Sequence, residues 1–141
     1  MLDLVRATDA PSSFDIRLLA LPQLKRTERH NPQRASGLAM KIASEGRWTV
    51  PLWVESGELL VMDGHHRLEA ARLLGLVRLP CALLSYDMPE LSVVSWNGNG
   101  QFPVAEVFAA GRTQSLLPYK TTRHLISCDM PKISCDLADL Q

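Results

Sequence analysis

The spacing of apolar residues predicts an α-helix in the segment that follows Asn31. Between residues 32 and 45, apolar side chains recur at every third or fourth position, which places them on one face of a helix. Asn31 is suited to the N-cap, Pro32 to the first helical position and Gly46 to a left-handed residue at the end. The expected buried face consists of Ala35, Leu38, Ala39 and Ile42. We therefore predict a helix that begins at Pro32 and ends before Gly46.

Short apolar runs that end at turn residues predict β-strands elsewhere in the chain. Two of these runs are separated by the turn-forming sequence Glu55-Ser56-Gly57, and another ends at Asn97-Gly98-Asn99-Gly100. The expected strands span residues 14–19, 50–54, 58–62, 79–86 and 91–96. The run 58–62 leads directly into a glycine turn and then into another helical pattern.

Two further helices are predicted by the same helical spacing. The first follows residue 67 and has Gly75 near its end, and its expected buried face consists of Ala70, Leu73, Leu74 and Val77. The second covers residues 103–110 and is closed by Gly111. Helices and strands mix without regular alternation, which favours a small α+β domain over residues 1–141. The part from about residue 127 shows little pattern.

The composition is that of a folded globular protein, with 46% hydrophobic and 21% charged residues in a chain of 141. Fifteen Lys and Arg balance fifteen Asp and Glu, which argues against a protein whose main task is to bind a nucleic-acid backbone. Residues 25–47 nevertheless contain six Lys or Arg against two acidic residues. This local excess fits either an anion site or a solvated helix face.

Three features indicate the compartment. No apolar run reaches the ~18–20 residues that cross a bilayer, and the opening sequence MLDLVRATDA lacks the pattern of a signal peptide. The cysteines, Cys81, Cys128 and Cys135, are odd in number and form no Cys-x-x-Cys pair, so a disulfide framework and a structural zinc site are both poorly supported. We expect a cytoplasmic protein without membrane contact.

The sequence Asp63-Gly64-His65-His66-Arg67 stands between a predicted strand and a predicted helix. A glycine turn followed by a helix N-terminus offers unpaired backbone N–H groups to an anion, and imidazole and guanidinium groups add donors for phosphate oxygens. A carboxylate beside a phosphate site is a common holder of Mg²⁺. The alternatives are a capping role for Asp63 with exposed histidines, and a zinc site, which adjacent histidines on opposite sides of a helix support poorly.

Three other positions are candidates for the same chemistry. The cluster Lys120-Thr121-Thr122-Arg123-His124 suits a phosphate or carboxylate, although surface loops also have this composition. Glu28, an acid among cations, is either solvated or a general base. Trp96 ends a strand before a glycine-rich turn and belongs either to the core or to a ligand pocket.

These residues together resemble the ParB/sulfiredoxin-like superfamily, whose members carry a Gly-x-x-x-Arg phosphate loop between a strand and a helix. The form at residues 63–67 is similar to that of the free L-serine kinases, and the resemblance covers residues 14–126. Glu28 stands where those kinases place a catalytic glutamate, and Trp96 where they use a tryptophan near the substrate. Residues 121–124 are similar to their Thr-Thr-Arg-His segment. The resemblance implies a mixed sheet with helices packed on it.

The resemblance also implies an ATP- or ADP-dependent phosphotransferase that acts, with Mg²⁺, on the hydroxyl of free L-serine or a similar hydroxy amino acid. Threonine, homoserine or a biosynthetic intermediate stay open as acceptors. Glu28 and Asp63 would be catalytic, with Asp63 also the metal ligand. The implied phosphate-binding residues are Gly64, His65, His66 and Arg67. The implied acceptor-binding residues are Trp96, Lys120, Thr121, Thr122, Arg123 and His124. The expected partners are the nucleotide and the amino acid, without nucleic acid, and a homodimer is compatible with the sequence.

The alternative within the same superfamily is a ParB-type module that binds CTP or ATP and has a regulatory or DNA-associated role without kinase activity. ParB partition proteins, however, carry a Gly-Glu-Arg-Arg type of loop and a helix-turn-helix domain, for which the chain has no room. Sulfiredoxins need a cysteine where this chain has His65. A DNA nuclease is the least favoured interpretation, because the chain is neutral and has no second acidic cluster near Asp63.

Overall fold

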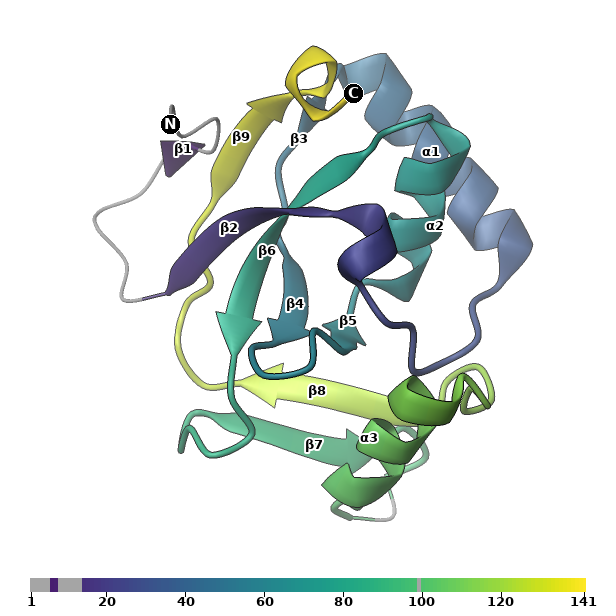
Figure 1. Ribbon diagram of the computed structural model, residues 1–141, viewed down its shortest axis with the longest axis vertical. Coiled ribbons are helices and arrows are strands. Elements are labelled where there is room, and N and C mark those ends of the chain that lie inside the picture. Colours follow the sequence, from purple (N-terminus) through teal and green to yellow (C-terminus); the bar gives the residue numbers. More distant parts are fainter. Residues whose placement is uncertain (1–5, 8–13, 99) are drawn as a thin grey trace.

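A four-stranded mixed sheet forms the centre of the computed structural model, which describes residues 6, 7, 14–98 and 100–141 (Figure 1). Its strands, in spatial order, are β2 (Asp15–Ala20), β6 (Arg78–Leu84), β4 (Leu52–Glu55) and β5 (Val61–Asp63). Strands β6 and β4 run parallel, and the outer pairs are antiparallel. The predicted α+β class is confirmed, and the residues around 63–67 follow an edge strand of this sheet.

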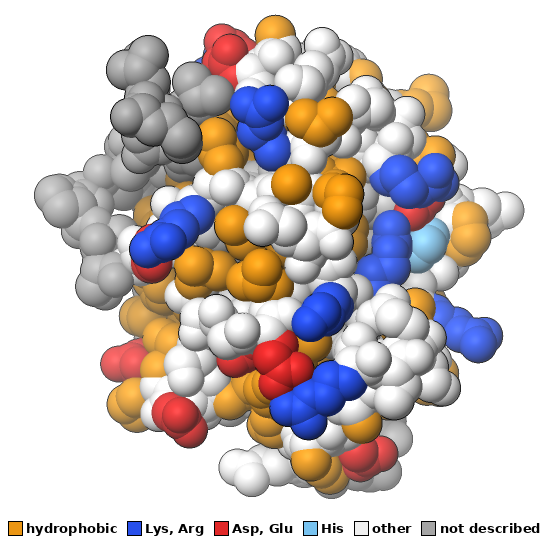
Figure 2. All heavy atoms as spheres, viewed as in Figure 1, with side chains coloured by type: hydrophobic (Ala, Val, Ile, Leu, Met, Phe, Trp, Pro, Cys, Tyr) orange, Lys and Arg blue, Asp and Glu red, His pale blue; other side chains and the backbone are white. Residues whose placement is uncertain are grey.

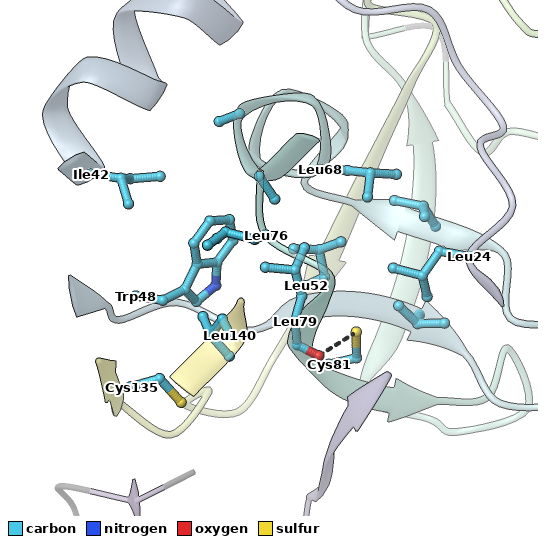
Figure 3. Close-up of a cluster of buried hydrophobic side chains, with 14 of the residues drawn as sticks. Leu24, Ile42, Trp48, Leu52, Leu68, Leu76, Leu79, Cys81, Cys135 and Leu140 are labelled. Atoms are coloured by element: carbon cyan, nitrogen blue, oxygen red, sulfur yellow. Dashed lines mark hydrogen bonds between the residues drawn. The ribbon is translucent and has the colours of Figure 1, made fainter. Parts of the chain in front are cut away.

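Helices α1 (Pro32–Glu45) and α2 (His65–Leu73) pack against each other on one side of the sheet (Figure 1). The predicted ends of α1 are confirmed: the Asn31 side chain accepts hydrogen bonds from the N–H groups of Gln33 and Arg34, and Gly46 has a φ of 71°. Figure 3 shows Ile42 of α1 and Leu68 of α2 beside Trp48 and Leu52 in the core. Burial of this continuous apolar cluster is what fixes the two helices on the sheet.

A two-stranded ribbon and a third helix stand at one end of the central sheet (Figure 1). The ribbon pairs β7 (Leu91–Ser95) with β8 (Thr122–Ile126), and α3 (Val104–Thr113) lies beside it. Strand β8 was absent from the predicted elements, and it contains part of the 120–124 cluster. Because β8 contacts β5, it brings that cluster close to the start of α2.

The residues from 127 onward fold onto the core, although their sequence shows little pattern. Strand β9 (Ile133–Asp136) lies between β1 (Arg6–Ala7) and β3 (Arg47–Trp48) in a second, antiparallel sheet, and a 3-10 turn (Leu137–Leu140) follows it. Ile133, Cys135 and Leu140 are buried in the main cluster. Figure 3 shows Cys135 and Leu140 there. Of the opening sequence MLDLVRATDA, only Arg6 and Ala7 are among the described residues. Asn99, part of the predicted turn at residues 97–100, lies outside them.

Several predicted elements are shorter than expected, and two of them bear on the predicted buried positions. Helix α2 ends at Leu73, and its buried face includes Leu68, Ala70 and Ala71. Leu73 and Val77, which were expected on that face, are each 48% exposed. The strand expected at 58–62 begins only at Val61, because Leu59 has a φ of 60° and prolongs the preceding turn. Within the described residues, no helix has both the length and the apolar character needed to cross a bilayer.

Gly111 lies inside α3 and does not close it, which corrects the predicted end. The helix continues to Thr113, and Gln114 takes the left-handed conformation that ends it. Gly111 is buried, and a β-carbon there would lie 2.3 Å from Cδ2 of Leu60, a fully buried side chain. The glycine therefore permits α3 to approach the core closely.

We expect Gly111→Ala to lower the free energy of unfolding by about 1–2 kcal/mol, because overpacking outweighs the better helix propensity of alanine. The matched control is Gly37→Ala in α1, where a β-carbon meets no atom within 4 Å. That change is expected to raise the free energy by roughly 0.5–1 kcal/mol. Urea unfolding of both variants measures the difference, and equal effects at the two glycines would contradict the close packing of α3.

Candidate active site

A cavity of about 350 Å³ opens at the N-terminus of α2, where most of the predicted site residues meet. The predicted residues that line it are Glu28, Asp63, Gly64, His65, His66, Arg67, Trp96, Lys120 and Thr122. Sequence reasoning missed five others: Arg29, Arg34, Leu38, Met62 and Tyr119. The basic excess of residues 25–47 was the signal that could have indicated the two arginines. Segments far apart in the chain therefore build one concave site.

The turn at Gly64 directs the start of α2 into this cavity. Gly64 has a φ of 106°, and a β-carbon there would lie 3.1 Å from Cγ of Leu52, so both the backbone conformation and the space favour glycine. Gly64, the N-cap residue, supplies no side-chain cap to the first turn of α2, and the Leu68 N–H donates to the Gly64 oxygen. The N–H groups of this first turn are the kind of donors that bind phosphate at helix N-termini.

Asp63 is the last residue of β5 and lines the cavity next to the turn at Gly64. The surrounding protein partly desolvates the carboxyl group and so raises its pKa, while the charge of Arg67 and the Gly64 N–H oppose that rise. The side chain stays open to solvent through the cavity. Asp63 therefore offers a negative charge next to the helix N-terminus.

Glu28 lies in the same cavity and is held by the segment 120–122. Its Oε1 accepts hydrogen bonds from the Thr122 N–H and hydroxyl, both at 3.0 Å, and its Oε2 accepts one from the Lys120 N–H at 3.2 Å. Burial raises the pKa of this carboxyl, and the hydrogen bonds from Thr122 and Lys120 partly offset the rise. The two carboxylates, Glu28 and Asp63, which are 35 positions apart in the chain, thus face one space.

The two imidazoles accept hydrogen bonds from the backbone. His65 Nε2 lies 3.1 Å from the Thr27 nitrogen and 3.2 Å from the Glu28 nitrogen, and His66 Nε2 lies 3.0 Å from the Asn31 nitrogen. Burial lowers the pKa of His65 to about 3, so the ring is neutral at pH 7. The predicted donation from both rings to phosphate is therefore corrected at Nε2, because in each ring this atom accepts backbone N–H groups.

Four cationic side chains line the cavity against the two carboxylates: Arg29, Arg34, Arg67 and Lys120. The Lys120 ammonium lies 5.3 Å from the centre of the Trp96 ring, and Arg34 donates a hydrogen bond of 3.0 Å to the Tyr119 hydroxyl. Figure 2 shows that Lys and Arg side chains also gather, beside a histidine, on the right-hand side of the face it presents. The balance of charge in the cavity favours a polyanionic ligand.

Three predicted acceptor-binding residues lie outside the cavity lining. The Thr121 hydroxyl donates to the Pro118 oxygen at 2.5 Å, and the Arg123 guanidinium lies 5.6 Å from the centre of the Trp96 ring. His124 is buried against Tyr86, with 2.8 Å between His124 Nε2 and the Tyr86 hydroxyl oxygen, and burial lowers its pKa to about 4. Neighbouring residues along β8 point to opposite faces, which separates Arg123 from Thr122. His124 shares the face of Thr122 but lies further along the strand, against Tyr86.

No family model matches the chain. A "ParB-like protein" of Sulfolobus acidocaldarius is 34% identical over 47 residues, which are 33% of this chain and 24% of that protein. An "ATP-dependent L-serine kinase" of Desulfurococcus mucosus is 29% identical over 83 residues, 56% of this chain and 32% of that protein. The matches thus span about a quarter to a third of the length of these curated relatives.

Similarity of structure extends much further along the chain. A solved free serine kinase, in which one glutamate is replaced by glutamine and AMP is bound, superposes with a TM-score of 0.82 at 14% identity. The superposition covers 92% of this chain and 95% of that one. The chain therefore has the fold of the free serine kinases, as the resemblance at residues 63–67 implied.

Proposed function

We propose that this protein is a small-molecule kinase that transfers a phosphoryl group from ATP or ADP to the hydroxyl of free L-serine or a similar hydroxy amino acid. The observation that carries the proposal is the meeting of Glu28, Asp63 and the uncapped N-terminus of α2 in one cavity. The fold and the curated relative named as an L-serine kinase support it. We also propose that residues 1–141 form a single domain of a cytoplasmic protein, that nucleic acid is not among its partners, and that it is able to form a homodimer.

Phosphoryl transfer depends mainly on positioning and on neutralising charge, and the cavity supplies both. The N–H groups at the start of α2 and the Arg67 guanidinium bind the phosphates of the nucleotide. Arg29, Arg34 and Lys120 add positive charge around the group being transferred. Trp96, with Lys120 against its ring, forms the wall on which the amino acid lies. Arg123 lies against the Trp96 ring, and the Thr121 backbone oxygen accepts the Trp96 backbone N–H at 3.1 Å, so both support this wall from outside the cavity. His124 packs against Tyr86 instead.

Glu28 accepts the proton of the acceptor hydroxyl. As the acceptor oxygen bonds to the terminal phosphorus, the bond from that phosphorus to the bridging oxygen breaks, and the nucleotide leaves with one phosphoryl group fewer. The proton passes to the Glu28 carboxylate. Because burial raises the pKa of Glu28, this carboxylate is a stronger base than one on the surface, and its hydrogen bonds to Thr122 and Lys120 hold it in place.

The residues present fit a magnesium ion. Both Glu28 oxygens already accept hydrogen bonds, so Asp63 is the carboxylate left to bind metal in this cavity. Mg²⁺ is often held by one or two carboxylates together with substrate phosphates, and no larger set of ligands is needed. Within the described residues, no group of three or more His, Cys, Asp or Glu side chains is placed to hold a metal ion. When bound, the ion neutralises phosphate charge.

The direct test is incubation with ATP or ADP, Mg²⁺ and a panel of L-serine, L-threonine and L-homoserine, followed by mass spectrometry for the phosphorylated amino acid. We expect O-phosphoserine or its analogue to form. A folded protein that phosphorylates no acceptor and binds no nucleotide would end the kinase proposal. Nucleotide binding that changes the oligomeric state without phosphoryl transfer would favour the ParB-type regulatory module.

The acid limb of the pH profile is expected to report Glu28. Only the ionised carboxylate accepts a proton, so kcat/KM falls as the pH drops through the raised pKa, and the midpoint lies above about 4.3, the ordinary value for glutamate. Replacing Thr122 by valine removes a hydrogen bond that lowers the pKa of Glu28. The midpoint therefore moves to higher pH in Thr122→Val.

The measurement is kcat/KM of the wild type and Thr122→Val across the acid range. Thr113→Val is the matched control, since the Thr113 hydroxyl donates to the Ala109 oxygen on α3 and does not line the cavity. Asp63 also has a raised pKa, but no hydrogen bond joins it to Thr122, so a shift specific to Thr122→Val identifies Glu28. A midpoint that moves to lower pH in Thr122→Val would contradict this assignment.

A further inference from the structure

We infer that His65 is a positioning residue for the base of the reaction: its Nε2 accepts the backbone N–H groups of Thr27 and Glu28 and thereby fixes Glu28 against the phosphate-binding end of α2. The inference rests on the proposed function and assigns His65 a role other than binding phosphate. It starts from the contacts of the ring, which join two segments 37 and 38 residues apart.

The contacts of His65 are those of an acceptor. Two backbone nitrogens lie within 3.2 Å of Nε2, and backbone nitrogens only donate. Nε2 must therefore carry a lone pair, and the ring proton belongs on Nδ1. A ring whose Nε2 accepts hydrogen bonds carries a single proton and no charge, and this ring is 8% exposed, so it brings no positive charge to a phosphate. The positive charge of the cavity comes from the arginines and Lys120.

The segment that carries Glu28 is attached to three neighbours. His65 binds its backbone at residues 27 and 28, and His66 binds it at Asn31, the N-cap of α1. On the other side, Arg29 N–H donates to the Leu117 oxygen at 2.8 Å, and Leu117 N–H donates to the Thr27 oxygen at 2.9 Å. The Thr27 hydroxyl also donates to the Val61 oxygen of β5 at 2.8 Å.

These attachments separate two tasks in one short motif. Gly64 and Arg67 serve the nucleotide, and the imidazole of His65 serves the base. Because His65 is the first residue of α2, any shift of the helix N-terminus carries Glu28 with it. The His65 imidazole thus links the start of α2 directly to the backbone that carries the base, and a misplacement of about 1 Å between reacting groups can cost about 10²-fold in rate.

A pair of substitutions tests the role of Nε2. In glutamine, the side-chain oxygen is as many bonds from the β-carbon as Nε2 is in histidine, whereas in asparagine it is one bond closer. We expect His65→Asn to lower kcat by about 10–100-fold with little change in nucleotide affinity, and His65→Gln to recover most of the activity. Equal defects in the two variants, or a loss confined to nucleotide affinity, would overturn the inference.

A double-mutant cycle with Glu28→Gln excludes a general structural defect. If His65 acts through Glu28, adding His65→Asn to Glu28→Gln lowers the residual activity far less than it lowers the wild type. Effects that multiply would overturn the inference. Thermal unfolding of each variant confirms that the proteins compared are folded.

Nitrogen NMR of the histidine side chains gives a readout that needs no activity. We expect His65 at neutral pH to be the neutral tautomer with the proton on Nδ1, and the amide protons of Thr27 and Glu28 to exchange faster in His65→Asn than in His65→Gln. A proton on Nε2 of His65 would overturn the inference. If His65 has the expected tautomer but the protein phosphorylates no acceptor, the kinase proposal is rejected. The attachment of the Glu28 segment to His65 would still hold in that case.

Discussion

Replacing Glu28 by glutamine is expected to lower kcat for phosphoryl transfer by about 10²–10⁴-fold, the range that general bases contribute. The amide has nearly the shape of the carboxylate, and its oxygen still accepts the hydrogen bonds of Thr122. It cannot take up the proton of the acceptor hydroxyl. Because Glu28 is assigned to the base and not to the phosphates, nucleotide affinity is expected to stay within a few-fold of the wild type.

Steady-state kinetics together with calorimetric titration of the nucleotide separate the two effects. Glu58→Gln is a matched control, because Glu58 pairs with Arg112 on the surface and does not line the cavity. It is expected to leave kcat unchanged. A Glu28→Gln enzyme with nearly normal kcat would move the base elsewhere in the cavity, and one that no longer binds nucleotide would place Glu28 at the phosphates.

Replacing Asp63 by asparagine is expected to have opposite effects with and without magnesium. In Mg²⁺ we expect kcat to fall by about 10²-fold or more, since a charge that organises the phosphates is lost. In EDTA the variant is expected to bind ADP at least as tightly as the wild type, because the negative carboxylate no longer repels the phosphates at the start of α2.

Two measurements test these effects: titration of ADP in Mg²⁺ and in EDTA, and activity over a range of Mg²⁺ concentrations. Asp87→Asn, at an exposed position outside the cavity, is the control. A higher Mg²⁺ requirement in Asp63→Asn is the expected result. An unchanged Mg²⁺ requirement would show that Asp63 does not bind the metal. Weaker ADP binding in EDTA would show that its charge does not repel the phosphates.

The parts of the fold that the sequence predicted are those governed by neighbouring residues. Helix α1 has its N-cap at Asn31 and its left-handed end at Gly46, and both act within one turn of the helix. The strand-turn-helix at residues 63–67 is equally local, because Gly64 supplies the positive φ that the turn needs. These short-range signals sufficed to locate the glycine turn and the start of α2, which lines the cavity.

The parts that escaped prediction depend on contacts between distant segments. Strand β9 is short, and it forms because β1 and β3 lie on either side of it. The need for a glycine at position 111 of α3 comes from close packing against Leu60, more than fifty positions earlier. His65 accepts hydrogen bonds from the backbone at residues 27 and 28, and the spacing of residues within the motif 63–67 gives no sign of these distant partners.

The place of β9 between β1 and β3 has a consequence for how the nascent chain folds during translation. Strand β3 and the fully buried Trp48 are synthesised early, but β9 and Leu140, which belong to the same sheet and core, emerge about ninety residues later. At roughly 5–20 residues per second, the ribosome leaves this apolar surface uncovered for several seconds or more. During that interval the growing polypeptide is a natural client for chaperones.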